Sequence, residues 1–263
     1  MVLVRQRDGS DYEPGMSLLR QLVLARAFPE IAFNGRLLLV TTLQGHQEGL
    51  TSVTFSPDGK MLASAGRDKT VKIWRRATNN SKDGFTFRLD KTLQQHNSTV
   101  WSVSFSPDSN ILASASKDKT AKLWNREGRL LKTLRGHQGW VNSVSFSPDS
   151  QVIASASDDQ TVKLWKRDGH LLKTFSPHDS WVLEVTFSPT DHLLASACWD
   201  NTVKLWRWDG RLLKTLLKGY SDSVNAVSFS PNGEILAAGS WDSTVKLWSR
   251  EANTDLKKEC DRW

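Results

Sequence analysis

Short apolar runs separated by turn residues dominate this 263-residue chain, and the same order of runs returns several times. The third copy is the clearest, with Val-Asn-Ser-Val-Ser-Phe at 141–146, Val-Ile-Ala-Ser-Ala-Ser at 152–157, Val-Lys-Leu-Trp at 162–165 and Leu-Leu-Lys-Thr-Phe at 171–175. Runs rich in Val, Leu, Phe and Thr that are bounded by Gly, Pro, Asp or Ser are typical of short strands with tight turns. The copies show no helical period. The pattern therefore predicts four antiparallel strands in each copy.

The second run of each copy is made of small residues on both faces, as in Ala-Ser-Ala-Ser at 154–157. A strand that is small on both sides fits between two sheets that approach each other closely. A copy length of about 42 residues with this arrangement predicts a β-propeller, in which each sheet is a blade flanked by its own copies. Between the first and second runs, Ser-Pro-Asp-Gly at 56–59 predicts a tight turn, with Pro57 at its second and Gly59 at its fourth position.

A polar quartet marks each copy: a His is followed eighteen residues later by Ser, four after that by Asp and six after that by Trp. The four complete quartets are His46, Ser64, Asp68 and Trp74; His96, Ser114, Asp118 and Trp124; His137, Ser155, Asp159 and Trp165; and His178, Ser196, Asp200 and Trp206. A worn fifth copy reads Tyr220, Ala238, Asp242 and Trp248. A hydrolase triad of Ser, His and Asp is needed once, so a set that recurs at identical spacing predicts a structural role. The His residues also stand one per copy, which argues against a metal site. We expect no catalytic residue, no metal and no cofactor.

The repeats divide the chain into three parts. Residues 1–34 form an N-terminal extension, expected to be partly helical or disordered, and residues 250–263 form a polar tail. The propeller is expected over 35–249, with repeats at about 42–90, 91–131, 132–172, 173–213 and 214–249. The segment from Asn34 resembles the outer run at 209–220, so we expect an N-terminal strand to complete the last blade and close a five-bladed ring. If the ring is incomplete, the alternatives are a piece of a longer array or self-association with another copy.

Charge, cysteine content and hydropathy indicate which classes of partner and which compartment to expect. The net charge of +7 is spread by the repeat, because Lys72, Lys122, Lys163, Lys204 and Lys246 share one position. We expect these lysines to form a solvated rim that keeps sheet edges from pairing, which makes nucleic acid an unlikely partner. Cys198 and Cys260 are too few for a disulfide framework, and no stretch approaches the ~20 apolar residues of a membrane span. These features predict a cytoplasmic protein without membrane contact.

The phrases V-x-S-V-x-F-S-P-D and L-A-S-A-S-x-D-x-T-V-K-L-W resemble the WD40 family, and the resemblance covers residues 36–249. It implies that the quartets are hydrogen-bonded tetrads within each blade and that peptides dock at the narrow end of the ring. Chemistry supports the tetrads, because indole, hydroxyl, imidazole and carboxylate can satisfy one another's buried polar atoms. The near-identity of the copies, with W-x-R-D-G-x-L-L-K-T, is similar to bacterial, cyanobacterial-type WD-repeat proteins.

The residues that differ between copies are the candidates for binding. They are Arg67, Trp101, Lys117, Trp140, Asp158, Trp181, Leu183, Trp199, Asn225 and Trp241. Clustered aromatic residues with Arg among them are typical of binding hot spots. For Trp140 and Trp181, packing against the neighbouring blade is an equal alternative, whereas Trp199 and Trp241 are expected at the surface. The sequence therefore predicts a non-enzymatic scaffold or sensor that binds a peptide or protein. The alternatives are the ligand-sensing array of a larger WD-repeat signalling protein and, less favoured, a basic nucleic-acid-binding propeller.

Overall fold

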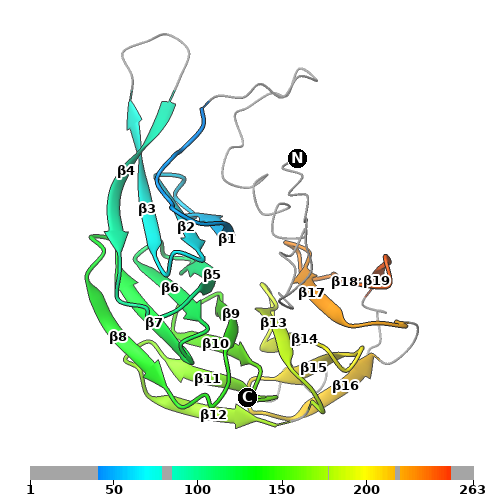
Figure 1. The fold of residues 1–263 in the computed structure, drawn as a ribbon. Helices are drawn as coiled ribbons and strands as arrows, with labels where there is room; N and C mark the ends of the chain where they lie inside the picture. Colours follow the sequence, from blue (N-terminus) through cyan, green and yellow to red (C-terminus); the bar gives the residue numbers. More distant parts are fainter. Residues whose placement is uncertain (1–40, 79–84, 177, 217–219, 250–263) are drawn as a thin grey trace, which may run out of the picture.

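Antiparallel β-sheets make up all of the regular structure in residues 41–78, 85–176, 178–216 and 220–249, which the computed structural model describes (Figure 1). They form five sheets. The first sheet consists of β1 (Leu50–Phe55), β2 (Met61–Gly66), β3 (Val71–Thr78) and β4 (Phe85–Leu93). The second sheet consists of β5 (Val100–Phe105), β6 (Ile111–Ser116), β7 (Thr120–Asn125) and β8 (Leu130–Arg135). The third sheet consists of β9 (Val141–Phe146), β10 (Val152–Ser157), β11 (Val162–Lys166) and β12 (Leu171–Phe175). The fourth sheet consists of β13 (Val182–Phe187), β14 (Leu193–Cys198), β15 (Val203–Arg207) and β16 (Leu212–Leu216). The fifth is β17 (Val224–Phe229), β18 (Ile235–Ser240), β19 (Val245–Ser249).

The five sheets stand side by side as blades. The first strands, β1, β5, β9, β13 and β17, line the inside of the array, and the fourth strands β4, β8, β12 and β16 lie outside. The all-β fold and the five blades of the prediction are thus confirmed. Within the described residues the last blade has three strands. The outer strand expected in the segment from Asn34 to His46 lies partly outside the described residues, and residues 41–46 of that segment form no strand. The N-terminal extension and the tail at 250–263 lie outside the described residues.

The blades follow an open arc. Each first strand contacts the first strand of the next blade, but in the described ranges β1 and β17 face each other across a gap (Figure 1). The expected ring closure is therefore not met by this part of the chain. Apolar side chains at both ends of the arc are consequently exposed, among them Val53 on β1 and Val245 on β19.

Small second strands set the distance between blades. All six residues of β2 and of β6 are buried, and Ala63, Ala113 and Ala154 expose no surface. Each of these alanines lies in a core cluster that joins two blades. The expectation that this strand lies between two closely approaching sheets is confirmed.

A serine and an aspartate hold the turn between the first and second strands. The Ser56 Oγ donates to Asp58 Oδ1 at 2.6 Å and accepts the Met61 amide at 2.9 Å, and the Gly59 amide donates to the Ser56 carbonyl at 2.8 Å. Gly59 has φ 66°, a left-handed conformation that glycine adopts without strain. The predicted turn at 56–59 is confirmed.

Hydrogen-bonded tetrads tie the first four blades together internally. In the third blade, Trp165 Nε1 donates to Ser155 Oγ at 2.8 Å, and the hydroxyl lies 2.7 Å from His137 Nε2. The other ring nitrogen of His137 lies 2.8 Å from Asp159 Oδ2. One chain of hydrogen bonds therefore runs from the third strand through the second strand to the loop that enters the blade.

The other three complete quartets repeat this geometry. The indole nitrogens donate to the serine hydroxyls at 2.9–3.0 Å, from Trp74 to Ser64, from Trp124 to Ser114 and from Trp206 to Ser196. Each of these hydroxyls lies 2.8 Å from the Nε2 atom of its histidine, which is His46, His96 or His178. The opposite ring nitrogens lie 2.7–2.9 Å from the carboxylates of Asp68, Asp118 and Asp200.

Burial distinguishes the tetrad residues from residues that a partner could reach. Three serines and three tryptophans of these quartets are buried, namely Ser64, Ser114, Ser196, Trp74, Trp124 and Trp206. Their polar atoms bond to one another inside the blade, so they do not form part of a binding surface. The structural role predicted for them from their spacing agrees with this placement.

The fifth blade replaces the tetrad with a simpler contact. The Tyr220 hydroxyl donates to the Ala238 carbonyl at 2.8 Å, and Trp248 stands edge-on to the Tyr220 ring. Asp242 keeps its place and accepts the Ser221 amide at 3.1 Å. Because Tyr220 reaches the backbone directly, the serine is no longer needed there.

Acid should destabilise the protein through these tetrads. Burial lowers the pKa of His96 and His178 below the usual 6.5, so both are neutral in the folded chain. Burial alone would raise the pKa of Asp118, but hydrogen bonds from His96 and Thr120 outweigh it and hold this pKa well below 3.8. Both kinds of group bind protons more readily when unfolded, so the free energy of unfolding should fall as the pH drops below about 6.5 and again below about 3.8. Urea titrations between about pH 7.5 and about pH 3 test this.

His96→Gln provides the control for the pH dependence, because it removes one titrating ring. Its free energy of unfolding should fall less between about pH 7.5 and about pH 5 than that of the wild type. A wild-type stability that stays flat over this range would contradict the assignment of neutral, buried tetrad histidines.

The repeated lysines on the third strands are buried, which corrects the expected solvated rim. Lys72, Lys122 and Lys163 have buried side chains, and each donates its Nζ to a threonine hydroxyl of the outer strand at 3.0–3.1 Å. In the fifth blade, Lys246 Nζ lies 3.9 Å from the centre of the Tyr220 ring. The sequence did not show this, because the threonine partner comes from a different strand. These charges join strands within a blade and are not offered to a phosphate backbone.

Candidate functional site

Two variable positions meet in every blade. One follows the tetrad histidine and the other precedes the tetrad aspartate, and the backbone joins them: the Trp199 amide donates to the Trp181 carbonyl at 3.0 Å. The same bond joins Asp158 to Trp140, and Trp241 to Ser223, at 3.0 Å each. The fold thus gathers the non-recurring side chains at one edge of each blade.

The aspartate of each tetrad also shapes the turn that carries the second variable position. In the fourth blade, Asp200 Oδ1 accepts the Thr202 hydroxyl at 2.5 Å and the Thr202 amide at 3.1 Å. Asn201 between them has φ 63°, a left-handed conformation that Asn tolerates better than most residues. Because hydrogen bonds to Asp200 fix this turn, the backbone that carries the Trp199 side chain is held in place.

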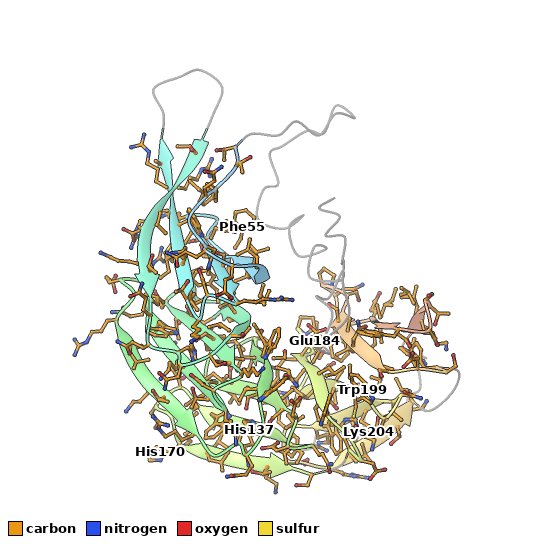
Figure 2. All side chains as sticks on the ribbon, in the orientation of Figure 1. Phe55, His137, His170, Glu184, Trp199 and Lys204 are labelled. Atoms are coloured by element: carbon orange, nitrogen blue, oxygen red, sulfur yellow. The ribbon has the colours of Figure 1, made fainter. Side chains whose placement is uncertain are left out.

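Four tryptophans stand at these edge positions of the third, fourth and fifth blades, and we call them the tryptophan rim: Trp140, Trp181, Trp199 and Trp241. The rings of Trp181 and Trp199 meet edge to face at 5.0 Å, and Trp199 lies 6.3 Å from Trp241 (Trp199 is labelled in Figure 2). Trp181 and Trp241 expose 40% and 39% of their surface, while Trp140 and Trp199 are half-buried. Lys117 Nζ lies 4.0 Å from the centre of the Trp140 ring, in cation–π contact.

Two of the predicted binding residues are core residues, which corrects the sequence prediction. Trp101 and Leu183 are buried. Their shared position points toward the following blade: the equivalent Asn142 donates its Nδ2 to the Val182 carbonyl of that blade at 3.0 Å. Trp101 accordingly lies 6.4 Å from Trp140, and its Nε1 is a buried donor with no recorded hydrogen bond.

The remaining predicted residues lie at the same edge with different environments. Arg67 is exposed in the first blade, and Asn225 is half-buried in the fifth. Asp158 accepts Asn142 Nδ2 at 2.7 Å, and burial raises the pKa of this carboxyl above its usual 3.8. The sequence did not identify Asn142, although its place in the Trp101 position was the available signal.

At the fourth tetrad lies the one group of His, Cys and acidic ligand atoms close enough for a metal in the described part of the chain. The three residues are His178 and Asp200, which belong to that tetrad, and the neighbouring Cys198, which does not. Burial raises the pKa of the Cys198 thiol, whereas a metal requires the thiolate. His178 and Asp200 already bond to each other at 2.8 Å as members of the tetrad, so the three residues do not fit a metal site.

A hollow of about 250 Å³ lies between the first and second blades. Its lining includes Gln47, Lys69 and Gln94, so it is separate from the tryptophan rim of blades three to five. Among the described residues, no helix is long and apolar enough to cross a membrane.

Five segments of the chain match the profile of the family described as "WD domain, G-beta repeat". They are residues 37–75, 87–125, 128–166, 169–207 and 210–249. Together they cover most of the chain, and each contains one complete or worn quartet.

Curated proteins match short segments of the chain, and two of them illustrate the matches. "Probable cytosolic iron-sulfur protein assembly protein 1" of Cryptococcus neoformans is 57% identical over 35 residues, which cover 13% of this chain and 8% of that protein. "Probable cytosolic iron-sulfur protein assembly protein Ciao1" of Drosophila mojavensis is 44% identical over 45 residues, 17% of this chain and 14% of the relative. The matched segments therefore span about one repeat of proteins from a fungus and a fly.

Proposed function

Because the chain belongs to the WD40-repeat family, we propose that it is a non-enzymatic scaffold whose tryptophan rim binds a peptide segment of a protein partner. Members of this family are protein–protein interaction scaffolds and are generally not enzymes. In this proposal the tryptophan rim is the docking site, and it corresponds to the narrow end of a propeller, where peptides dock in the family. The observation that carries it is the contact between Trp181 and Trp199 at 5.0 Å, with Trp241 next in the row.

Three properties of the rim support binding. Backbone bonds hold Trp140 and Trp199 beside complete tetrads, so little conformational freedom is lost at these two rings when a partner docks. Trp181 and Trp241 expose large apolar surface, and exposed aromatic clusters are enriched at interaction sites. Lys117 and Asp158 flank the row with opposite charges, which can orient a peptide.

The rim can be tested with a double variant that combines Trp199→Ala and Trp241→Ala. Peptides selected from a random library on the wild-type protein should bind the double variant about 700-fold more weakly, because two hot-spot tryptophans at about 2 kcal/mol each contribute about 4 kcal/mol together. The melting temperature should stay nearly unchanged, since the Trp241 side chain is exposed and the Trp199 side chain is only half-buried. Isothermal titration calorimetry measures the binding, and thermal unfolding measures the stability.

Leu171→Ala is the matched control for the rim variant. Leu171 exposes 47% of its surface on the outer strand β12. The control variant therefore also removes an exposed apolar side chain, but away from the tryptophan rim. Equal weakening in the control, or full affinity in the double variant, would refute the rim as the docking site. A large fall in melting temperature would instead assign Trp199 and Trp241 to the core.

The finer assignments extend this proposal. We infer a cytoplasmic protein, in line with the word "cytosolic" in the names of the two relatives. The short matches support no role in iron–sulfur assembly, because they cover 8% and 14% of those proteins. As a second candidate we propose the ligand-sensing array of a larger WD-repeat signalling protein; the expected similarity to cyanobacterial-type proteins does not support it, since the matched relatives are eukaryotic. A nucleic-acid ligand would instead show affinity that falls steeply with salt.

A further inference from the structure

The two ends of the arc carry exposed apolar faces whose equivalents are buried or partly buried at the internal blade junctions. On the first-blade face, Leu50 and Val53 are 52% and 55% exposed, whereas the equivalent Val100 and Val103 of the second blade are 0% and 3% exposed. Phe55, labelled on the first blade in Figure 2, packs against the core cluster of Leu62, Trp74 and Phe87. On the last-blade face, Val245 and Leu247 are 64% and 66% exposed. Their equivalents on β3, β7 and β11 expose 2% or less.

The internal junctions show what these faces fit. Between the first and second blades, Val71 and Ile73 of one blade share a core cluster with Val100 and Val103 of the next. The same positions form the cluster between the second and third blades. At the ends of the arc, Val245 and Leu247 occupy the places of Val71 and Ile73, and Leu50 and Val53 occupy those of Val100 and Val103. The last-blade face therefore has the residues that the first-blade face requires, and both lie on one chain.

Charge complementarity follows the same direction. Arg126 donates to Asp58 of the preceding blade at 2.9 Å, and Arg167 donates to Asp108 at 2.7 Å. In the first blade, Arg76 holds the arginine position. In the last blade, Asn232 holds the aspartate position, and its Nδ2 donates to Glu234 Oε2 at 2.6 Å, which keeps a carboxylate at that corner.

We propose that the last-blade face of one copy of this chain packs against the first-blade face of a second copy, repeating the internal blade junction between molecules. Within one molecule the two faces stand on opposite sides of the gap (Figure 1), so each requires the other from a neighbour. Such head-to-tail contact buries Leu50 and Val53 under Val245 and Leu247 and brings Arg76 toward Glu234. It is a heterologous interface, which leaves one end of each pair open for a further copy.

Sedimentation velocity tests the proposal on the full chain. The apparent mass of the wild type should exceed the monomer mass of 29.6 kDa and should rise with protein concentration. Val53→Glu removes the first-blade face and Leu247→Glu removes the last-blade face, so each variant alone should be monomeric. Mixed in equal amounts, the two should form a dimer that grows no further, because each supplies the intact face that the other lacks.

Two controls keep the outcome independent of folding. Leu171→Glu introduces the same charge on an outer strand and should associate like the wild type. Ala226→Ser should strengthen the association: at the first three internal junctions a serine at this position accepts an amide of the next blade, as Ser52 does from Val103 at 3.3 Å. Thermal unfolding of all variants shows that they remain folded, because the two glutamates replace residues that are already exposed.

Three results would overturn the proposal. A wild type that is monomeric at every concentration would mean that the chain's own ends meet or that blades of a longer protein cover them. Association that survives both single variants would locate the contact elsewhere. Association that is lost in one variant only, and that the mixture does not restore, would indicate contact between like faces.

Discussion

Replacing Asp159 with Ala should lower the free energy of unfolding by about 3 kcal/mol, because one carboxylate serves four donors inside the third blade. Its Oδ2 accepts His137 Nδ1 and the Gln138 amide at 2.8 Å each. Its Oδ1 accepts the hydroxyl and the amide of Thr161 at 2.6 Å and 3.1 Å. Alanine removes the carboxylate acceptor from the buried His137, whose Nδ1 then has only the Thr161 hydroxyl, at 3.2 Å, near it. A urea titration followed by tryptophan fluorescence measures the loss.

Asp242→Ala is the matched control for the tetrad. Asp242 holds the same place in the fifth blade, but Tyr220 replaces the histidine, and the neighbouring Thr244 is exposed. Water can replace the lost carboxylate there, so the free energy of unfolding should fall clearly less than in Asp159→Ala. Equal losses in the two variants would contradict the assignment of the complete tetrad as the device that holds a blade together.

Ala154→Leu should cost about 2–3 kcal/mol of stability by forcing two blades apart. Ala154 lies on the second strand β10, exposes no surface, and belongs to the cluster that includes Val182 and Val185 of the fourth blade. Protein interiors are close-packed, so three added carbons have no space to occupy without moving a whole sheet. A urea titration measures the loss, and the dependence of the unfolding free energy on urea concentration should be the same in the variant and the wild type.

The equivalent substitution at the end of the arc should be nearly neutral. Ala237 occupies the place of Ala154 on β18 and is half-buried, because no blade of the described chain packs against that face. At low protein concentration, Ala237→Leu should therefore leave the free energy of unfolding almost unchanged. A loss as large as that of Ala154→Leu would mean that the last-blade face is covered in solution.

The quartets and the strand pattern could be predicted from the sequence because each tetrad is built within one repeat. His137, Ser155, Asp159 and Trp165 lie within 28 positions of one another, so their spacing alone encodes their geometry. The same holds for the turn at Ser56 and for the small second strands. Features internal to a copy recur with it, and repetition makes them visible.

Contacts between copies could not be predicted in this way. Trp101 and Leu183 differ from repeat to repeat like surface residues, yet the next blade covers them. The lysines at the position of Lys72 look like a charged rim, although their amines reach a threonine on another strand. The opening of the arc has the same origin, because the angle between blades depends on how neighbouring sheets pack and not on how many repeats are present.

The simplified fifth blade implies an uneven resistance to local unfolding along the array. In a linear array of blades, an end unit has one neighbour where the others have two, and within the described residues this end unit also has three strands and a single Tyr220–Ala238 contact in place of a tetrad. Fluctuations that expose backbone amides should therefore start at β17–β19 and spread inward, while the third blade opens last. The row of tryptophans runs from that steady centre to the loosest end, so Trp140 keeps its position while Trp241 moves with the fraying blade.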